Sequence, residues 1–200
     1  MAEEIFLGIP KFDKVKLIIL NPFYGQKDYR SDRNKDCRKN YHSKSSTGLA
    51  INSKIVSFAT PIKEMLLKIG VPYESLNGKD KEAIIEPIGK SGRELMQSLG
   101  TEWGRQLIDE NIWVFAMQKQ VERINEDIII IDDLRFPNEA NWVLVNRGII
   151  IELKRDGVEC NDNHSSEKPL PKQFITQSID TTNLEDGINK VIDEIEQMFY

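Results

Sequence analysis

Cysteine and histidine are scarce in this chain of 200 residues, which contains two of each. Cys37 and Cys160 lie far apart in polar surroundings, so the sequence has neither a disulfide framework nor the spacing of a metal-binding motif. With only two histidines in addition, a zinc site is not expected. The scarcity of cysteine leads us to expect a reduced, cytosolic protein.

Long apolar runs are absent as well. No stretch approaches the ~20 residues that a helix needs to cross a bilayer. The first residues lack the charged segment followed by an apolar core that marks a signal peptide. We therefore expect a cytoplasmic protein without a membrane partner. Apolar residues make up 40% and charged residues 30% of the chain, which is typical of a globular protein with a true core.

A strong excess of one charge sign is also missing. The net charge is −5, so the chain as a whole is not a polyanion binder. Basic residues gather between Lys27 and Lys44. This segment fits either a contact with phosphates or a solvated loop, and a nucleic-acid partner is not expected.

Strands and helices are predicted to alternate along the chain. Uninterrupted or alternating apolar residues predict strands at 15–20, 54–59, 128–131, 149–153 and within 174–180. Apolar residues three and four apart predict helices at 62–69, 91–108, 112–124, 138–146 and 184–199, and residues 71–90 are expected to form a loop. This order indicates βαβ crossovers and hence a three-layer α/β/α fold with a mainly parallel sheet. We expect one domain over 1–200, with an N-terminal extension at 1–13, an irregular polar insertion at 28–53 and a lid-like loop at 156–172.

The most informative stretch is Ile128 to Ala140, in which four isoleucines run directly into Asp132 and Asp133. A strand that is apolar at every position is covered on both faces, which is typical of a central parallel strand. Ligands of open α/β sheets bind just beyond the carboxyl ends of such strands. An acid at this place resembles the Walker B pattern, which holds Mg²⁺ directly or through water. A buried strand followed by a solvated turn is the competing interpretation.

The first predicted strand is followed by Asn21 to Tyr29, where a nucleotide-binding sheet would carry its phosphate loop. Lys27 stands at a plausible distance from the strand, and Gly25 precedes it in a turn. Glycines allow backbone amides to wrap a phosphate, and here Asn21 and Gln26 replace both glycines of the motif. By itself this segment is a weak signal, and an ordinary turn explains it equally well.

Arginines on the predicted helix 91–108 are the next candidates. Arg93 lies four residues before Gln97, and Thr101 lies four residues before Arg105, so each pair shares a helix face. The planar guanidinium group suits phosphate, whereas ion pairs with Glu94 or Glu102 are the common alternative.

Five segments from Ser57 onward form a set that can be compared with known families: Ser57–Glu64, Gly92–Arg105, Asn111–Val114, Asp132–Ala140 and His164–Glu167. Together they resemble the phage deoxynucleoside monophosphate kinases. The resemblance implies a fold like that of P-loop nucleoside monophosphate kinases. It also implies a phosphotransferase that uses Mg²⁺ and moves the γ-phosphate of ATP to a deoxynucleoside monophosphate (dNMP), which forms the diphosphate (dNDP). Such an enzyme would serve the deoxynucleotide metabolism of a bacteriophage, in the host cytoplasm if a phage encodes it.

The resemblance also implies roles for individual residues. On the donor side, Gly25 and Lys27 would bind ATP, Lys27 and Asp28 would act in catalysis, and Asp132 would support the metal. The acceptor side and the lid would use Arg93, Gln97, Arg105, Arg135, Phe136, Arg155, His164 and Glu167, with Arg93 and Arg155 also acting in catalysis.

The loop at Lys27 departs from the family pattern, which is glycine-rich and ends Gly-Lys-Asp-Thr. Gln26 stands where the family has the last glycine, and Tyr29 where it has the hydroxyl residue threonine. This departure supports an alternative function, a catalytically impaired, kinase-derived protein that binds nucleotides. The resemblance leaves a homodimer open, and it does not indicate which base is preferred.

Overall fold

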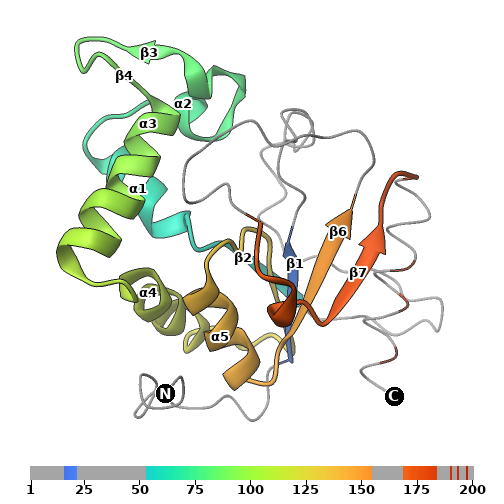
Figure 1. The fold of residues 1–200 in the computed structure, drawn as a ribbon. Helices are drawn as coiled ribbons and strands as arrows, with labels where there is room; N and C mark the ends of the chain where they lie inside the picture. The colour runs from blue at the N-terminus through green and yellow to red at the C-terminus, as the bar shows by residue number, and fades with distance from the viewer. Residues whose placement is uncertain are drawn as a thin grey trace. The chain divides into compact units, whose positions relative to one another are not determined.

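The computed structural model describes residues 16–21, 53–154 and 169–183, and also Lys190, Asp193 and Gln197. The chain divides into two compact units. Within the described residues, one unit contains the strands of a five-stranded sheet and the helix α5, and the other contains residues 57–123. Each unit is described by itself (Figure 1). The expectation of one domain over 1–200 stays a prediction.

The sheet has the strand order β2-β5-β1-β6-β7, and neighbouring strands all run parallel. Its strands are β1 (Lys16–Asn21), β2 (Ser53–Val56), β5 (Ile128–Ile131), β6 (Ile149–Lys154) and β7 (Gln177–Asp180). The predicted α/β class with a mainly parallel sheet is confirmed. The expected strand 54–59 ends earlier, at Val56, because the chain turns at residues 58 and 59 into the next helix.

The isoleucine run forms an interior strand of the sheet, β5. Ile128, Ile129 and Ile131 are almost fully buried, and Ile128 packs in one cluster with Ile151 and Ile179. β5 pairs with β1 on one side and with β2 on the other. A strand with neighbours on both sides and apolar residues on both faces is what the sequence predicts for 128–131.

The helix α5 (Pro137–Val145) connects β5 to β6. Trp142 and Val143 on this helix are completely buried, and Figure 1 shows α5 beside the sheet. Proline at the first helical position has a suitable fixed φ and no N–H to lose, which explains where the helix begins. After the helix, Arg147 adopts a positive φ of 58°, and β6 follows at once.

The strand order creates a point of divergence between β1 and β5. From β1 the chain proceeds toward β2 at one edge of the sheet, whereas from β5 it proceeds to β6 on the other side of β1. In open α/β sheets, ligands bind beyond the carboxyl ends of the strands at such a switch point. The carboxyl ends of β1 and β5 therefore mark the favoured location for a site.

The second unit is mainly helical. It contains α1 (Thr60–Lys68), α2 (Tyr73–Asn77), the 3₁₀ helix η2 (Lys79–Glu82), α3 (Gly92–Gln97), the π-helix η3 (Ser98–Ile108) and α4 (Ile112–Val121), with a hairpin of β3 (Ile84–Ile85) and β4 (Lys90–Ser91). The expected loop at 71–90 is wrong, because α2, η2 and most of the hairpin lie there. Helices and strands of two to five residues are too short for a periodic pattern of apolar residues, so the sequence could not reveal them.

The helix predicted over 91–108 changes type along its length. It is α-helical to Gln97 and a π-helix from Ser98 to Ile108. Trp113 of α4 donates its indole N–H to the carbonyl of Gly100 over 2.7 Å, and both groups are buried. At Gly104 an added Cβ would lie 2.5 Å from Cζ2 of Trp113. The indole thus contacts the π-helix at two glycines, which lets α4 approach η3 closely.

Several expectations fall on residues outside the described part of the chain. They concern the segments 1–13 and 28–53, the lid-like loop 156–172 up to residue 168, and most of the helix predicted over 184–199. No helix among the residues that the structure describes is long and apolar enough to cross a membrane.

Candidate functional site

Asp132 is the first residue after β5, as the sequence indicated. Its backbone N–H donates to the carbonyl of Val56 over 3.3 Å, which extends the pairing with β2 by one residue. Because Ile19 of β1 pairs with Ile131, the next residues along the two strands, Leu20 and Asp132, lie at the same level of the sheet. Asp132 is half-buried, and Asp133 beside it is buried. A carboxylate therefore stands beside the end of β1, at the switch point of the sheet.

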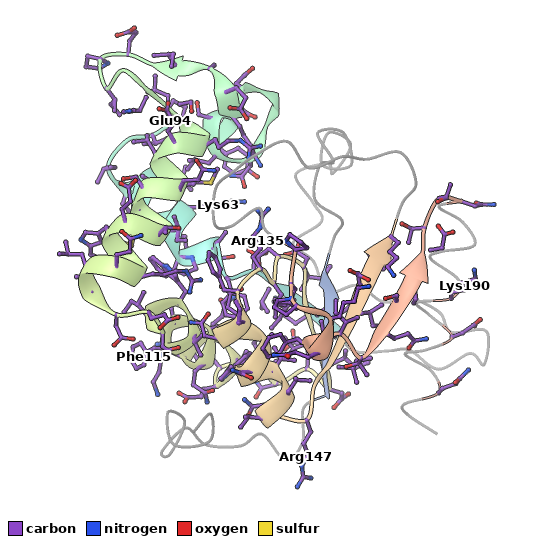
Figure 2. All side chains as sticks on the ribbon, in the orientation of Figure 1. Lys63, Glu94, Phe115, Arg135, Arg147 and Lys190 are labelled. Carbon is purple, nitrogen blue, oxygen red and sulfur yellow. The ribbon has the colours of Figure 1, made fainter. Side chains whose placement is uncertain are left out.

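The turn that follows Asp132 is held by Glu139 from the first turn of α5. The Oε2 atom of Glu139 accepts the N–H of Arg135 over 2.8 Å and the N–H of Phe136 over 3.0 Å. Arg135 and Phe136 are half-buried, whereas Leu134 before them is completely buried. Figure 2 labels Arg135 in this turn. The two predicted acceptor-site residues thus follow Asp132 on a turn that is tied to the helix.

Arg93 lies in the other unit, in the first turn of α3. Ser91 caps this helix: its Oγ accepts the N–H of Glu94 over 3.2 Å, and its own N–H donates to Oε2 of Glu94 over 2.8 Å. The N–H of Ser91 and the ammonium of Lys90 lower the pKa of Glu94. Gly92 allows close packing, since a Cβ there would lie 1.8 Å from the carbonyl oxygen of Ser75. Arg93 therefore stands on a rigidly capped and packed helix start.

The side chain of Arg93 forms an ion pair with Glu82, through Nε and Oε1, at 2.5 Å. The alternative that the sequence suggested was Glu94, which instead pairs with Lys90 over 3.2 Å. Glu82 belongs to η2 and precedes Arg93 by eleven residues, so helical spacing could not reveal it. The predicted phosphate clamp thus already carries a carboxylate partner.

Arg105 lies in the π-helix, and its guanidinium donates to the carbonyl of Glu110 over 3.1 Å. This bond closes the turn that follows η3, so Arg105 has a structural contact of its own. Gln97 is the last residue of α3 and is half-buried. The shared face expected for Thr101 and Arg105 was derived for an α-helix and does not apply unchanged, because the backbone hydrogen bonds here span five residues.

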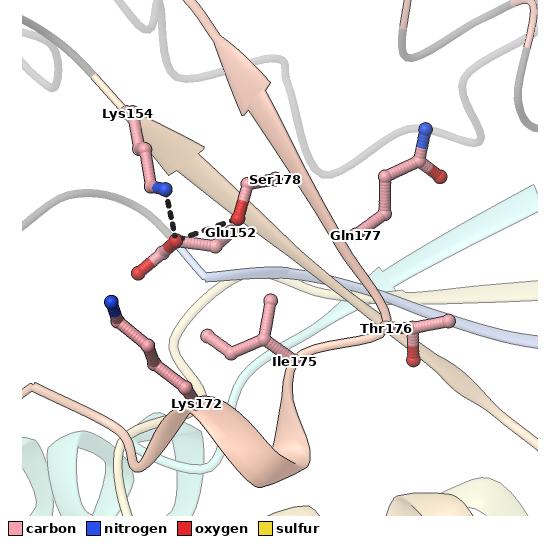
Figure 3. A pocket seen from close by; sticks show the side chains of 7 residues that line it. All are labelled: Glu152, Lys154, Lys172, Ile175, Thr176, Gln177 and Ser178. Atoms are coloured by element: carbon pink, nitrogen blue, oxygen red, sulfur yellow. Dashed lines mark hydrogen bonds and ion pairs between the residues drawn. The ribbon is translucent and has the colours of Figure 1, made fainter.

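A hollow among the described residues lies elsewhere, on β6, β7 and the 3₁₀ helix η5 (Lys172–Phe174). It has a volume of about 240 Å³ and is shallow and open (Figure 3). Glu152 accepts a hydrogen bond from Ser178 over 2.8 Å and pairs with Lys154 over 3.2 Å. No prediction pointed to this hollow, and its charged groups face solvent.

The remaining predicted site residues lie outside the described part of the chain. They are Gly25, Lys27, Asp28, Arg155, His164 and Glu167. Among the described residues, no group of three or more acidic, histidine or cysteine side chains could hold a metal ion by itself.

Comparison with known proteins identifies the family. Residues 71–188 match the family model of deoxynucleotide monophosphate kinases, which is more than half of the chain. The chain belongs to this kinase family. The matched segment includes Arg93, Gln97 and Arg105 as well as the stretch from Asp132 to Glu139, and it begins well after the loop at Lys27.

Two curated phage kinases are similar in sequence to this chain, each over a little more than 100 residues. The deoxynucleoside-5'-monophosphate kinase of Escherichia phage T5 is 29% identical over 125 residues, which cover 59% of this chain and 49% of that protein. The deoxynucleotide monophosphate kinase of Escherichia phage RB69 is 32% identical over 108 residues, which cover 50% of this chain and 44% of that protein. The chain spans about half the length of the curated relatives it matches.

Family membership agrees with the α/β fold and the parallel sheet. The matched residues include the start of α3 in one unit and the carboxyl end of β5 in the other. Sequence reasoning missed Glu82 and the function of Glu139. The second could have been found, because a glutamate three residues after the residue that precedes a helix is half of a capping box.

Proposed function

We propose that the chain is a deoxynucleoside monophosphate kinase, which transfers the γ-phosphate of ATP to a dNMP and releases a dNDP and ADP. The observation that carries the proposal is the family match over 71–188, because it includes the acid-ended strand at the switch point of the sheet. The names of the two phage relatives support the same reaction.

Phosphoryl transfer depends on positioning and charge neutralisation more than on covalent chemistry. In our proposal, Arg93 and Arg105 neutralise the acceptor phosphate. Gln97 contacts the nucleotide, and Arg135 and Phe136 border the acceptor site. Binding of a phosphate at Arg93 would replace the carboxylate of Glu82, which is a feasible exchange because both side chains are partly exposed. The phosphate carries more charge than a carboxylate, and the guanidinium can donate two parallel hydrogen bonds to it.

The residues at the end of β5 fit a magnesium ion. Mg²⁺ is usually bound by one or two carboxylates together with substrate phosphates, rather than by a cage of protein ligands. Asp132, half-buried beside the end of β1, offers one such carboxylate. When bound, the ion would neutralise charge on the phosphates. We assign the donor side to Gly25, Lys27 and Asp28, and the lid to Arg155, His164 and Glu167.

The alternative function is a kinase-derived protein that binds nucleotides without turnover. Gln26 favours it, because a side chain replaces the glycine that lets backbone amides approach a phosphate. The two proposals differ on the donor side only. A protein of the second kind would bind a dNMP and would neither bind ATP tightly nor release ADP.

Titration calorimetry with ATP and with each dNMP, followed by an ADP-release assay at high enzyme and Mg²⁺, separates the two functions. The kinase proposal expects binding of both nucleotides and ADP release that depends on a dNMP. Arg93→Ala should weaken dNMP binding by about tenfold or more, since hydrogen bonds to charged groups contribute about 1.5–3 kcal/mol. The exposed Arg123→Ala is the matched control and should bind as the unaltered protein does. No ADP release with any dNMP would reject the kinase proposal.

A further inference from the structure

The turn between β5 and α5 is fixed at both of its ends. At its start, the N–H of Asp132 donates to the carbonyl of Val56. At its end, the N–H groups of Arg135 and Phe136 both donate to one oxygen of Glu139, over 2.8 and 3.0 Å. Two neighbouring N–H groups that point to one atom fix the planes of two successive peptides. The directions in which the side chains of Arg135 and Phe136 leave the backbone are fixed with them.

Glu139 is unusual among the acidic residues of the described chain because it is only 1% exposed. Burial of a carboxylate is costly unless hydrogen bonds replace its contacts with water. The two backbone donors supply such bonds, and the start of α5 favours a negative charge at this place. In an ordinary capping box, the glutamate accepts only the N–H of the capping residue, here Phe136. Glu139 also accepts the N–H of Arg135, and this second hydrogen bond connects the helix start to the turn that precedes it.

We infer that Glu139 is a positioning residue of the nucleotide site, which holds Arg135 and Phe136 in the orientation that binds the acceptor. The inference rests on the proposed function, since it assigns those two side chains to the dNMP. Glu139 itself is buried and acts through the backbone of the turn. A structural role alone would affect stability, whereas a positioning role also affects dNMP binding in a protein that remains folded.

The test compares Glu139→Ala and Glu139→Gln with a control at the other end of the same helix. Asn146→Ala is the control, because Asn146 is equally buried and its Nδ2 donates to the carbonyl of Trp142 over 2.8 Å. Calorimetry with the dNMP that binds best should show affinity weakened about tenfold or more in Glu139→Ala, as misplaced binding groups commonly cause. Glu139→Gln keeps a carbonyl acceptor and should lose less, and it replaces Glu139→Ala if that variant does not fold. Asn146→Ala should stay within about twofold of the unaltered protein.

A double-mutant cycle with Arg135→Ala decides whether Glu139 acts through Arg135. If it does, Glu139→Ala should cost little further affinity once Arg135 is removed, because the two changes disable one group. Unchanged affinity in folded Glu139→Ala and Glu139→Gln would overturn the inference. Effects of Glu139→Ala that multiply fully both with that of Arg135→Ala and with that of Phe136→Ala would also overturn it.

Hydrogen exchange distinguishes a failure of the inference from a failure of the proposed function. In the protein without nucleotide, the amides of Arg135 and Phe136 should exchange much faster in Glu139→Ala than in Asn146→Ala. If the unaltered protein binds no dNMP, both the proposed function and the assignment of Glu139 to a nucleotide site are rejected. If it binds a dNMP and the two amides exchange no faster in Glu139→Ala, the inference fails alone.

Discussion

The packing of Trp113 against the π-helix can be tested by a methyl group at Gly104. In Gly104→Ala the new Cβ would lie 2.5 Å from Cζ2, 2.8 Å from Cε2 and 2.9 Å from Nε1 of the indole. The ring is 3% exposed and its N–H is bonded to Gly100, so it has little room to move. Alanine at Gly104 therefore displaces the ring or the helix and weakens the bond to Gly100.

The size of the effect follows from three contributions. Overpacking of a well-packed site costs about 1–3 kcal/mol. Weakening of a buried hydrogen bond adds about 0.5–1.5 kcal/mol. Alanine in a helix interior returns about 0.8–1.0 kcal/mol relative to glycine. We expect Gly104→Ala to lower the free energy of unfolding by about 1–3 kcal/mol, and the melting temperature by about 2–4 °C for each kcal/mol in a chain of this size.

Gly100→Ala is the matched control on the same helix. Its Cβ would lie 3.1 Å from Cδ1 of Ile62, which is the end of a flexible side chain. The gain in helix propensity should offset this contact, so the stability should change by less than about 1 kcal/mol. Urea unfolding followed by circular dichroism measures both variants. If Gly104→Ala is as stable as Gly100→Ala, the close contact with Trp113 does not limit the packing, and the reasoning is refuted.

Two further predictions concern the region around Arg93. The N–H of Ser91 and the ammonium of Lys90 lower the pKa of Glu94 in the folded protein. The charge on Glu94 therefore stabilises the folded state fully at a pH above its ordinary pKa of 4.5. This contribution is lost as the pH falls through the lowered pKa of the folded protein. The difference in unfolding free energy between the unaltered protein and Glu94→Gln should therefore be constant from pH 5 to 7 and shrink below about pH 4.5. A difference that grows as the pH falls would contradict the capping role of Glu94. Glu82→Gln removes the carboxylate partner of Arg93 and should strengthen dNMP binding in calorimetry by about fivefold or less, as exposed ion pairs contribute about 0–1 kcal/mol. Glu122→Gln, which breaks the exposed ion pair with Lys119, is the control. Weaker dNMP binding in Glu82→Gln would instead mean that Glu82 orients Arg93 for the ligand.

The isoleucine strand and its acidic end could be predicted because the signal is local. An apolar run of the length of a strand, followed at once by Asp132 and by proline at a helix start, leaves few alternatives for β5 and α5. The neighbours of β5 could not be predicted, since parallel pairing depends on residues far apart in the sequence. The position of Asp132 beside the end of β1 therefore needed the structure.

The π-helix shows where a periodic pattern is insufficient. Apolar residues three and four apart are compatible with both helix types over so short a length. A contact outside the helix accompanies the π form: Trp113 approaches Gly100 and Gly104, which have no side chains in its way. Likewise, the partner of Arg93 follows from the packing of η2 and α3, whereas the sequence suggested Glu94 or Glu102.

Product analysis tests the kinase proposal most directly. The full chain is incubated with ATP, Mg²⁺ and each of the four dNMPs, and the nucleotides are separated by anion-exchange chromatography. The proposal predicts that at least one dNMP is converted to its dNDP, with one ADP formed for each dNDP, and that Arg93→Ala slows this conversion while Arg123→Ala does not. Unchanged ATP and dNMP after prolonged incubation at high enzyme would contradict the proposed activity.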